Sequence, residues 1–417
     1  MYTTPKRKLI IEREEFIIMR HKRLTAYIAA ACIAMSALAG CSSSSTATTT
    51  AATEAQTTVA ETAAETTTAE TTVAEAAEET RTIIDHAGNE ITLPAELARV
   101  VISGLLPLPS VFVQFRGSAD EIVGIHPSSM AAAENSYLIN IYPEILEADT
   151  SFVVNGAVNI EELMKLDPDV VYYSATNVEE YELYKKAGIP AVGFSTTIAD
   201  YDCVETYAEW IDLFGKIYGE QEAADAIIAE GRQVAEEIIS VTSEIPEEEK
   251  PRVMIIMNYA NGVMKVVGSN FFSEYWIESA GGINVAAELS SSNEVNMEQV
   301  YEWDPDMIFI TNFSPYLAED LLNNTIDGHD WSNVKAVKEG NVYKFPLGMY
   351  RWFPPASDTP LVLQWLAKTI HPDLFEDMDM DAEIRDFYKT HYNADLTDED
   401  IQDIYNPARE ASGVKTN

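Results

Sequence analysis

Short, continuous apolar runs, bounded by Gly, Pro or polar residues, recur along the chain from residue 99 onward. In the first half they lie at 99–103, 121–126, 169–174 and 190–195. Continuous rather than alternating apolar runs are typical of strands buried on both faces of a sheet. Between the last two runs, the segment 177–188 has a helical pattern that ends at a Gly. The order strand, helix, strand predicts a βαβ unit.

A second set of apolar runs follows a long helical region. In that region apolar residues recur every three or four positions, at Val204, Tyr207, Ile211, Phe214 and Tyr218. Gly219 is a potential break, after which strong helix formers continue to residue 241. The second set of predicted strands lies at 252–257, 265–268, 306–311 and 341–345. The pattern predicts an α/β chain with an N-terminal lobe at 81–200, a connecting helical region at 201–245 and a C-terminal lobe with terminal helices at 246–417.

One pattern occurs once in each predicted lobe, just before a strand. It reads NIEELMKLDPDVVYY at 159–173 and NMEQVYEWDPDMIFI at 296–310. The leading Asn159 and Asn296 are good N-cap residues. Three positions later, Glu162 and Gln299 predict a capping box. The next apolar positions predict a helix face turned to the core, and the helix ends at a Pro. These residues are Leu163, Leu166 and Pro168 in one copy, and Val300, Trp303 and Pro305 in the other.

Glu161 and Glu298 are the shared residues that neither capping nor packing requires. Each stands at the second helical position, where a carboxylate gains a few tenths of a kcal/mol, up to about 1, from the helix dipole. Stabilisation of the helix N-terminus is one explanation of the pair, and a role outside the fold is the other.

The chain is strongly acidic. It has 27 Lys and Arg against 68 Asp and Glu, a formal net charge of −41. Nucleic acids and anionic membrane surfaces carry the same sign, so both are poor partners for this chain. With 417 residues, 47% of them hydrophobic, the chain is long enough for two ordinary cores.

The first forty residues predict a secretory signal rather than a part of the fold. From Met19, the expected true start, a basic stretch leads into a short apolar run and then small residues. The run ends in Leu-Ala-Gly-Cys at Cys41, which resembles a bacterial lipobox, in which the Cys is lipidated. Residues 41–80 are mostly Ser, Thr, Ala, Glu and Val and predict a disordered tether. Cys203, the one other Cys after the signal, is expected to be a small buried residue.

Further motifs carry a resemblance that covers about residues 81–371. They are Asp85, Gly88 and Pro94 in an Asp-x-x-Gly-x-x-x-x-x-Pro spacing, NIEELMKLDPDVV, and WFPPASDTPLVLQWLAKTIHPDLF from Trp352. With the lipobox and the tether, these resemble a substrate-binding lipoprotein of an ABC importer. The type handles iron-siderophores, haem, cobalamin and related metal chelates, and some relatives bind molybdate or tungstate.

The resemblance implies a fold, a function and partners. The fold is two Rossmann-like lobes joined by one long α-helix, the class III periplasmic-binding-protein fold, with a ligand cleft between the lobes. The function is capture of an iron complex (siderophore, haem or corrinoid) for a membrane permease and its ATPase. Molybdate or tungstate is the alternative ligand. A monomer is implied, with no catalysis and no cofactor, anchored by Cys41 at the extracellular face of the cytoplasmic membrane. In this family a Glu at the place of Glu161 or Glu298 meets an Arg pocket on the permease.

In a two-lobed α/β binder the ligand lies at the carboxyl ends of the strands. Candidate segments in the first lobe are 103–109, 126–130, Asn155 and Ser174, and in the second 258–261, Phe313 and 347–355. Arg351 is the leading candidate because its planar donor fork suits carboxylates and oxyanions. The neighbouring Tyr350 and Trp352 supply flat faces for a ring ligand. Tyr259, His126 and Asn155 complete the predicted set.

Several of these residues have structural alternatives. His126 is more often a hydrogen-bonded structural residue than a ligand. Met130 and Met349 could be soft ligands or core filler. Tyr259 and Trp352 could be cavity wall or core. The scattered histidines do not converge as a free-metal site requires, so capture of a chelate or an oxyanion is favoured; the metal, if any, is unknown. An extracellular enzyme is disfavoured because Gly-x-Ser-x-Gly, His-Glu-x-x-His and P-loop motifs are absent from the sequence. A surface sensor on the same fold would not need Glu161 and Glu298.

Overall fold

The computed structural model describes residues 80–414, which belong to a compact unit of residues 75–417. The predicted signal at 1–40, Cys41 and the tether up to residue 79 lie outside the described residues. Within the described part, none of the helices combines the length and the apolar character that a membrane crossing needs.

The first lobe contains a four-stranded parallel sheet in the order β4-β3-β7-β8. The strands are β3 (Val100–Ile102), β4 (Ile122–Ile125), β7 (Val170–Ser174) and β8 (Ala191–Phe194), so all four predicted strands are confirmed. The helices are α2 (Leu108–Arg116), α3 (Pro127–Ala133), α4 (Leu138–Ile141), α5 (Ile160–Met164) and α6 (Val178–Ala187), with the 3-10 helix η1 (Pro143–Glu147). Two hairpins flank the sheet, β1 (Thr80–Ile84) with β2 (Glu90–Pro94), and β5 (Val153–Val154) with β6 (Ala157–Val158).

The second lobe contains a mixed sheet in the order β12-β10-β9-β13-β14, with β11 also paired to β9. Its strands are β9 (Arg252–Ala260), β10 (Val263–Val267), β11 (Ile283–Asn284), β12 (Ser292–Val295), β13 (Met307–Ile310) and β14 (Val342–Lys344). The four predicted strands are confirmed, while β11 and β12 were not predicted. The helices are α9 (Phe272–Ser279), α10 (Met297–Trp303), α11 (Ala318–Leu322) and α12 (Lys335–Glu339), with the 3-10 helix η2 (Glu247–Glu249) before β9.

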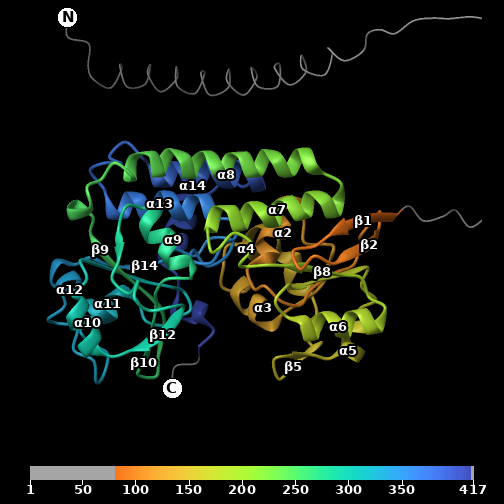
Figure 1. Ribbon diagram of the computed structural model, residues 1–417, viewed down its shortest axis with the longest axis horizontal. Helices are drawn as coiled ribbons and strands as arrows, with labels where there is room; N and C mark the ends of the chain where they lie inside the picture. The colour runs from red at the N-terminus through yellow and green to blue at the C-terminus, as the bar shows by residue number, and fades with distance from the viewer. Residues whose placement is uncertain (1–79, 415–417) are drawn as a thin grey trace, which may run out of the picture. The chain divides into compact units, whose positions relative to one another are not determined.

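A helical hairpin connects the lobes. Its helices are α7 (Cys203–Tyr218) and α8 (Gln221–Thr242), and Gly219 between them has a positive φ of 69°. The ion pair from Glu205 to Arg232, at 2.6 Å, joins the start of α7 to the middle of α8, so the helices run antiparallel. The connecting region therefore contains two helices, of which α8 is the long helix that joins the lobes. Figure 1 shows that the 22-residue α8 is the element that extends over both lobes.

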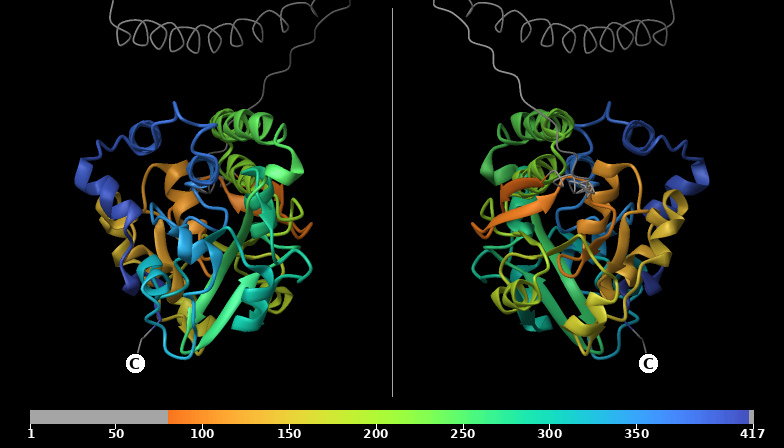
Figure 2. Two further views of the ribbon diagram at one scale, coloured as in Figure 1. Left: turned by 90° about the vertical axis from the view of Figure 1, so that its left-hand side faces the viewer. Right: turned by 90° about the vertical axis from the view of Figure 1, so that its right-hand side faces the viewer.

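The C-terminal helices contact both lobes. They are α13 (Thr359–Ile370), α14 (Met380–Tyr392), α15 (Asp398–Tyr405) and the 3-10 helix η3 (Arg409–Ser412). From α14, the rings of Tyr388 and Tyr392 meet those of Tyr137 and Tyr142, which flank α4, at centroid distances of 5.7 and 6.3 Å. Figure 2 shows these helices beside first-lobe segments. One apolar core also runs through both lobes and includes Phe112, Trp210 and Trp352.

The repeated pattern folds alike in both lobes. The Asn159 side chain accepts the N–H of Glu161 and the Asn296 side chain accepts that of Gln299, both at 3.0 Å, so the predicted N-caps are confirmed. The prediction of a capping box at Glu162 is wrong. The Glu162 carboxylate pairs with Lys165, and the Asn159 N–H donates to a carbonyl outside the helix instead.

Each copy is tied to a neighbouring strand by an Arg whose contacts were not predicted from the sequence. Asp169 Oδ2 accepts the N–H of Arg99 at 2.8 Å, and Asp306 Oδ2 accepts the N–H of Arg252 at 2.7 Å. The two guanidinium groups donate to carbonyls at the ends of α5 and α10. The structural repeat therefore includes the Arg-Val start of each central strand.

Candidate ligand site between the lobes

A cavity of about 130 Å³ lies between the lobes, at the carboxyl ends of their strands. The first lobe contributes the loop after β3, one residue after β8 and one side chain of α7. The second contributes α9 and the loops after β13 and β14. The lining residues are Leu105, Leu106, Pro107, Thr196, Trp210, Phe272, Phe313, Tyr350, Pro354 and Pro355. The predicted position of the cleft is thus the position of the cavity.

The surface that lines the cavity is apolar and is formed by aromatic and aliphatic groups. Thr196, Trp210 and Tyr350 carry polar side-chain atoms, but these atoms do not contribute to that surface. Burial raises the pKa of Tyr350, so its hydroxyl stays neutral and can donate a hydrogen bond. The indole of Trp210 is fixed by a 2.7 Å hydrogen bond from Nε1 to the carbonyl of Ser195. Such a wall favours an occupant that is bound by shape and by a small number of polar contacts.

Arg351 lies directly behind this wall. Its guanidinium carbon is 4.5 Å from the ring centroid of Phe313 and 5.6 Å from that of Tyr350. Nη2 donates to the carbonyl of Ala411 at 2.9 Å and Nη1 to the Tyr350 hydroxyl at 3.3 Å. The side chain is only 4% exposed, its Nε has no partner, and within residues 80–414 no carboxylate forms an ion pair with it. The cavity is therefore backed by a buried cation that lacks a counter-ion.

Two further cations lie close to Arg351. Lys344 Nζ donates to the carbonyls of Thr311, Ser314 and Tyr316, at 2.9, 2.6 and 3.0 Å. Burial, then repulsion by Arg409 and Arg351, lowers the pKa of the Lys344 ammonium to about 7. Arg409 is paired with Asp320. In a chain of net charge −41, three basic side chains are therefore close together, and Arg351 is the one among them that is neither paired with a carboxylate nor lowered in pKa to about 7.

The structure brings Tyr350 and Arg351 together at the cavity but not the other predicted aromatics. Trp352 is fully buried, donates from Nε1 to Asp358 at 3.0 Å and packs toward Trp365 in the shared core. Tyr259 is also fully buried. Its hydroxyl is hydrogen bonded to His329 in a separate core of the second lobe. Neither is among the residues that line the cavity.

His126 and Asn155 have local structural roles. His126 is the N-cap of α3, where its Nδ1 accepts the N–H of Ser128 at 3.0 Å, and burial lowers the pKa of its imidazole. Asn155 is exposed and forms, with Gly156, the two-residue turn between β5 and β6, both with positive φ. Met349 is fully buried in the shared core.

Four residues of this region were not predicted from the sequence: Thr196, Trp210, Phe272 and Lys344. Trp210 lies in a helix whose apolar positions at a spacing of three or four point to a core, so nothing in its pattern marks it as cavity wall. Thr196 follows β8 directly, and the rule that ligands lie after strand ends could have found it. In the described chain, no group of three or more His, Cys, Asp or Glu side chains is placed to hold a metal ion.

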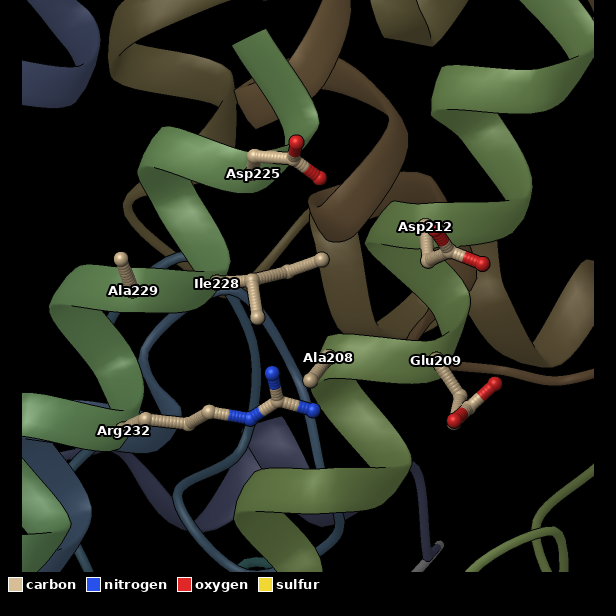
Figure 3. Close-up of a pocket in the computed structure, with 7 residues that line it drawn as sticks. All are labelled: Ala208, Glu209, Asp212, Asp225, Ile228, Ala229 and Arg232. Carbon is tan, nitrogen blue, oxygen red and sulfur yellow. The ribbon is translucent and has the colours of Figure 1, made fainter. Parts of the chain in front are cut away.

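A larger hollow of about 370 Å³ lies between α7 and α8 and is a weaker candidate. Figure 3 shows Arg232 of α8 extending toward Ala208 of α7, while the carboxylates of Glu209 and Asp212 point away from α8. It is formed by the helical hairpin alone, away from the strand ends of either lobe. Its cation, Arg232, already pairs with Glu205.

Glu161 and Glu298 are both exposed, and neither carboxylate has a hydrogen bond or an ion pair with another described side chain. Their helices, α5 and α10, lie in different lobes, on the side of the unit away from α8 (Figure 1). The pair thus presents two unpaired negative charges, one from each lobe, on one side.

Residues 120–347, which are more than half of the chain, match the sequence model of one protein family. The description of that family is "periplasmic binding protein". The chain belongs to the periplasmic binding protein family. This periplasmic binding protein is 26% identical over 336 residues to the molybdate-binding protein MolA of Haemophilus influenzae, a match that covers 75% of this chain and 91% of that one. It is 24% identical over 271 residues to the Fe(3+)-citrate-binding protein YfmC of Bacillus subtilis, covering 64% and 78%.

Among solved structures, a periplasmic solute binding protein from Veillonella parvula matches with a TM-score of 0.71 and 34% identity, covering 78% of this chain and 97% of that one. These likenesses confirm the two-lobed fold. The protein is therefore a solute-binding protein, and its family works in the periplasm or outside the cell. Its relatives are binding proteins rather than enzymes.

Proposed function

We propose that this periplasmic binding protein captures a small oxyanion of the molybdate type in the cavity between its lobes and delivers it to a membrane permease. The observation that carries the proposal is the Arg351 guanidinium, buried behind the cavity wall without a carboxylate partner. An uncompensated buried charge costs several kcal/mol. An anion in the cavity would offset that cost, and a guanidinium suits an oxyanion because it presents several donors in one plane.

The size of the cavity supports a small ligand. Its volume of about 130 Å³ is below the roughly 300–1,000 Å³ that is typical of sites for drug-sized molecules. A tetrapyrrole or a large siderophore would need much more space than this conformation offers. The similarity to MolA supports the same class of ligand.

Calorimetric titration of residues 75–417 with molybdate, tungstate, sulfate and ferric citrate tests the proposal. We expect molybdate or tungstate to bind, and Arg351→Gln to weaken that binding at least tenfold, because a charge-assisted contact is worth about 1.5–3 kcal/mol. Arg232→Gln, which removes an exposed ion pair on α8, is the matched control and should bind like the unmodified protein. Binding of ferric citrate without any response to molybdate would contradict the oxyanion.

An iron complex is the second candidate. The aromatic wall of the cavity and the similarity to a ferric-citrate binder favour it. Ferric citrate is itself anionic and could use Arg351 in the same way. An absorption spectrum and a metal analysis of protein purified from cells would identify a tetrapyrrole or bound iron directly.

For delivery, we propose that Glu161 and Glu298 dock on cationic pockets of the permease, whose ATPase drives import. Their exposure, their lack of partners and their shared side of the unit support this role. The proposed anchor is a lipid on Cys41, which fits a Bacillus subtilis relative named as a lipoprotein.

A further inference from the structure

The loop that carries Tyr350 and Arg351 is built round one buried carboxylate, that of Asp358. Asp358 Oδ2 accepts the N–H of Met349 at 2.7 Å, the N–H of Tyr350 at 3.4 Å and Nε1–H of Trp352 at 3.0 Å. The side chain is fully buried, and within residues 80–414 no cation forms an ion pair with it. Burial raises the pKa of this carboxyl to about 7. The three donors all reach Oδ2, while Oδ1 is buried without a hydrogen-bond partner.

Asp358 does not serve the helix that it precedes. It is the N-cap residue of α13, a position where an Asp carboxylate normally accepts an N–H of the first helical turn. Here the side chain makes no such bond and is turned to the preceding loop instead. Helix capping therefore does not explain the residue, although the helix dipole still favours its negative charge.

Other hydrogen bonds hold the two ends of the loop, from Asn312 Nδ2 to the carbonyls of Phe345 and Pro346 and from Trp276 Nε1 to that of Phe353, whereas Asp358 holds the N–H groups in its middle. Between Phe345 and Ala356 the loop has no helix or strand, only an isolated bridge between Leu347 and Arg351. Gly348 lies so close to the carboxylate that a Cβ there would collide with Asp358. The first lobe reaches the same loop, because Tyr137 N–H donates to the Gly348 carbonyl at 2.8 Å. The carboxylate is thus wrapped by loop backbone at the junction of the lobes.

We propose that Asp358 is a positioning residue of the ligand site. Its carboxylate holds the backbone from Met349 to Trp352 so that Tyr350 forms the cavity wall and Arg351 lies behind it. Asp358 does not touch the ligand itself. The inference rests on the proposed function in one respect, which is that the cavity between the lobes is the ligand site.

The first measurement is the affinity of residues 75–417 for sodium molybdate. We expect Asp358→Ala to weaken binding at least tenfold. Asp358→Asn keeps one carbonyl acceptor for the loop N–H groups and should recover most of that loss. The matched control is Asp169→Asn. Asp169 Oδ2 also accepts two backbone N–H groups, but Asp169 directly precedes β7 and so lies at the end of the first-lobe sheet that is opposite the cavity. An equal loss of affinity in the control would overturn the positioning role.

The second measurement is hydrogen exchange of the peptide covering residues 345–353 in the ligand-free protein. We expect exchange there to be at least tenfold faster in Asp358→Ala and unchanged in Asp169→Asn. Unaltered exchange in Asp358→Ala overturns the inference for any ligand. Faster exchange with unaltered molybdate affinity also overturns it, since the loop would then not matter for binding.

The two proposals fail separately. If the unmodified protein does not bind molybdate, the proposed ligand is wrong, and the exchange experiment alone decides whether Asp358 holds the loop. If Asp358→Ala does not fold, both measurements use Asp358→Asn instead. We then expect a smaller loss of affinity and a smaller increase in exchange. If neither changes, the positioning role is wrong.

Discussion

Lys344 shows how burial makes a single charge sensitive to pH. Folding lowers the pKa of its ammonium from 10.5 to about 7, first by desolvation and then by repulsion from Arg409 and Arg351. Between these values the unfolded chain holds a proton that the folded protein lacks, so the free energy of unfolding rises with pH. This contribution is complete above pH 10.5 and is lost as the pH falls through 7.

A Lys344→Met variant should lack this pH dependence. We expect the unmodified protein to gain a few kcal/mol of stability relative to the variant between pH 7 and pH 10. Urea unfolding at pH 7, 8.5 and 10 measures it. Lys335→Met, which removes a more exposed lysine, controls for the loss of one charge. If the difference in free energy of unfolding between Lys344→Met and the unmodified protein stays constant with pH, Lys344 is not neutral in the folded protein.

The candidate site could be predicted only in part at this scale, because strand ends reveal position but not direction. Tyr350, Arg351 and Trp352 are consecutive, yet only the first lines the cavity, the second lies behind it and the third points into the core. Tyr259 likewise falls in a strand that ends toward the cleft, but its side chain faces the other core. Which side a residue of an irregular loop faces depends on contacts with residues far away in sequence, such as that of Arg351 with the carbonyl of Ala411.

Among the elements, α5 and α10 are the repeated unit that the sequence predicted most fully. Their N-caps, apolar faces and Asp-Pro-Asp ends are local features, and the local rules were right. The capping box was wrong because Glu162 and the Asn159 N–H found partners outside the predicted box. The edge strand β12, with the polar sequence SNEV, gave no apolar run to detect.

Replacement of each N-cap should cost similar stability in the two lobes. We expect Asn159→Ala and Asn296→Ala each to lower the free energy of unfolding by about 1 kcal/mol. Asn333→Ala, at an exposed turn residue, is the control and should change it by less than about 0.5 kcal/mol. Chemical denaturation measures all three. A cost no larger than that of the control would show that the bonds from Arg99 and Arg252 hold these helices without help from the caps.

At the scale of the whole unit, the two lobes are less separate than the sequence suggested. The segment 246–417 was assigned to the second lobe, but α14 packs against the first through Tyr388 and Tyr392. The apolar core that both lobes share includes residues of α7 and α13, and it also joins the two lobes. Aromatic contacts between residues some 250 positions apart leave no periodic signal in the sequence, whereas the alternation of strands and helices within each lobe does.

Reversal of the docking charges should separate transport from binding. We expect Glu161→Arg with Glu298→Arg to abolish import of the ligand in cells, because both lobes would then repel cationic pockets on the permease. The affinity for molybdate in solution should stay within twofold of normal, since α5 and α10 do not line the cavity. Uptake assays and calorimetry together measure this. Glu179→Arg with Glu302→Arg, at other exposed positions, serves as the control for charge.

The common core and the C-terminal helices that join the lobes affect how loaded and empty copies of the protein compete for the permease. We expect lobes tied in this way to keep Glu161 and Glu298 at nearly the same spacing whether the cavity is filled or empty. An empty copy would then occupy the permease almost as readily as a loaded one. We expect the two to compete, so that overproduction of the binding protein slows uptake when its ligand is scarce.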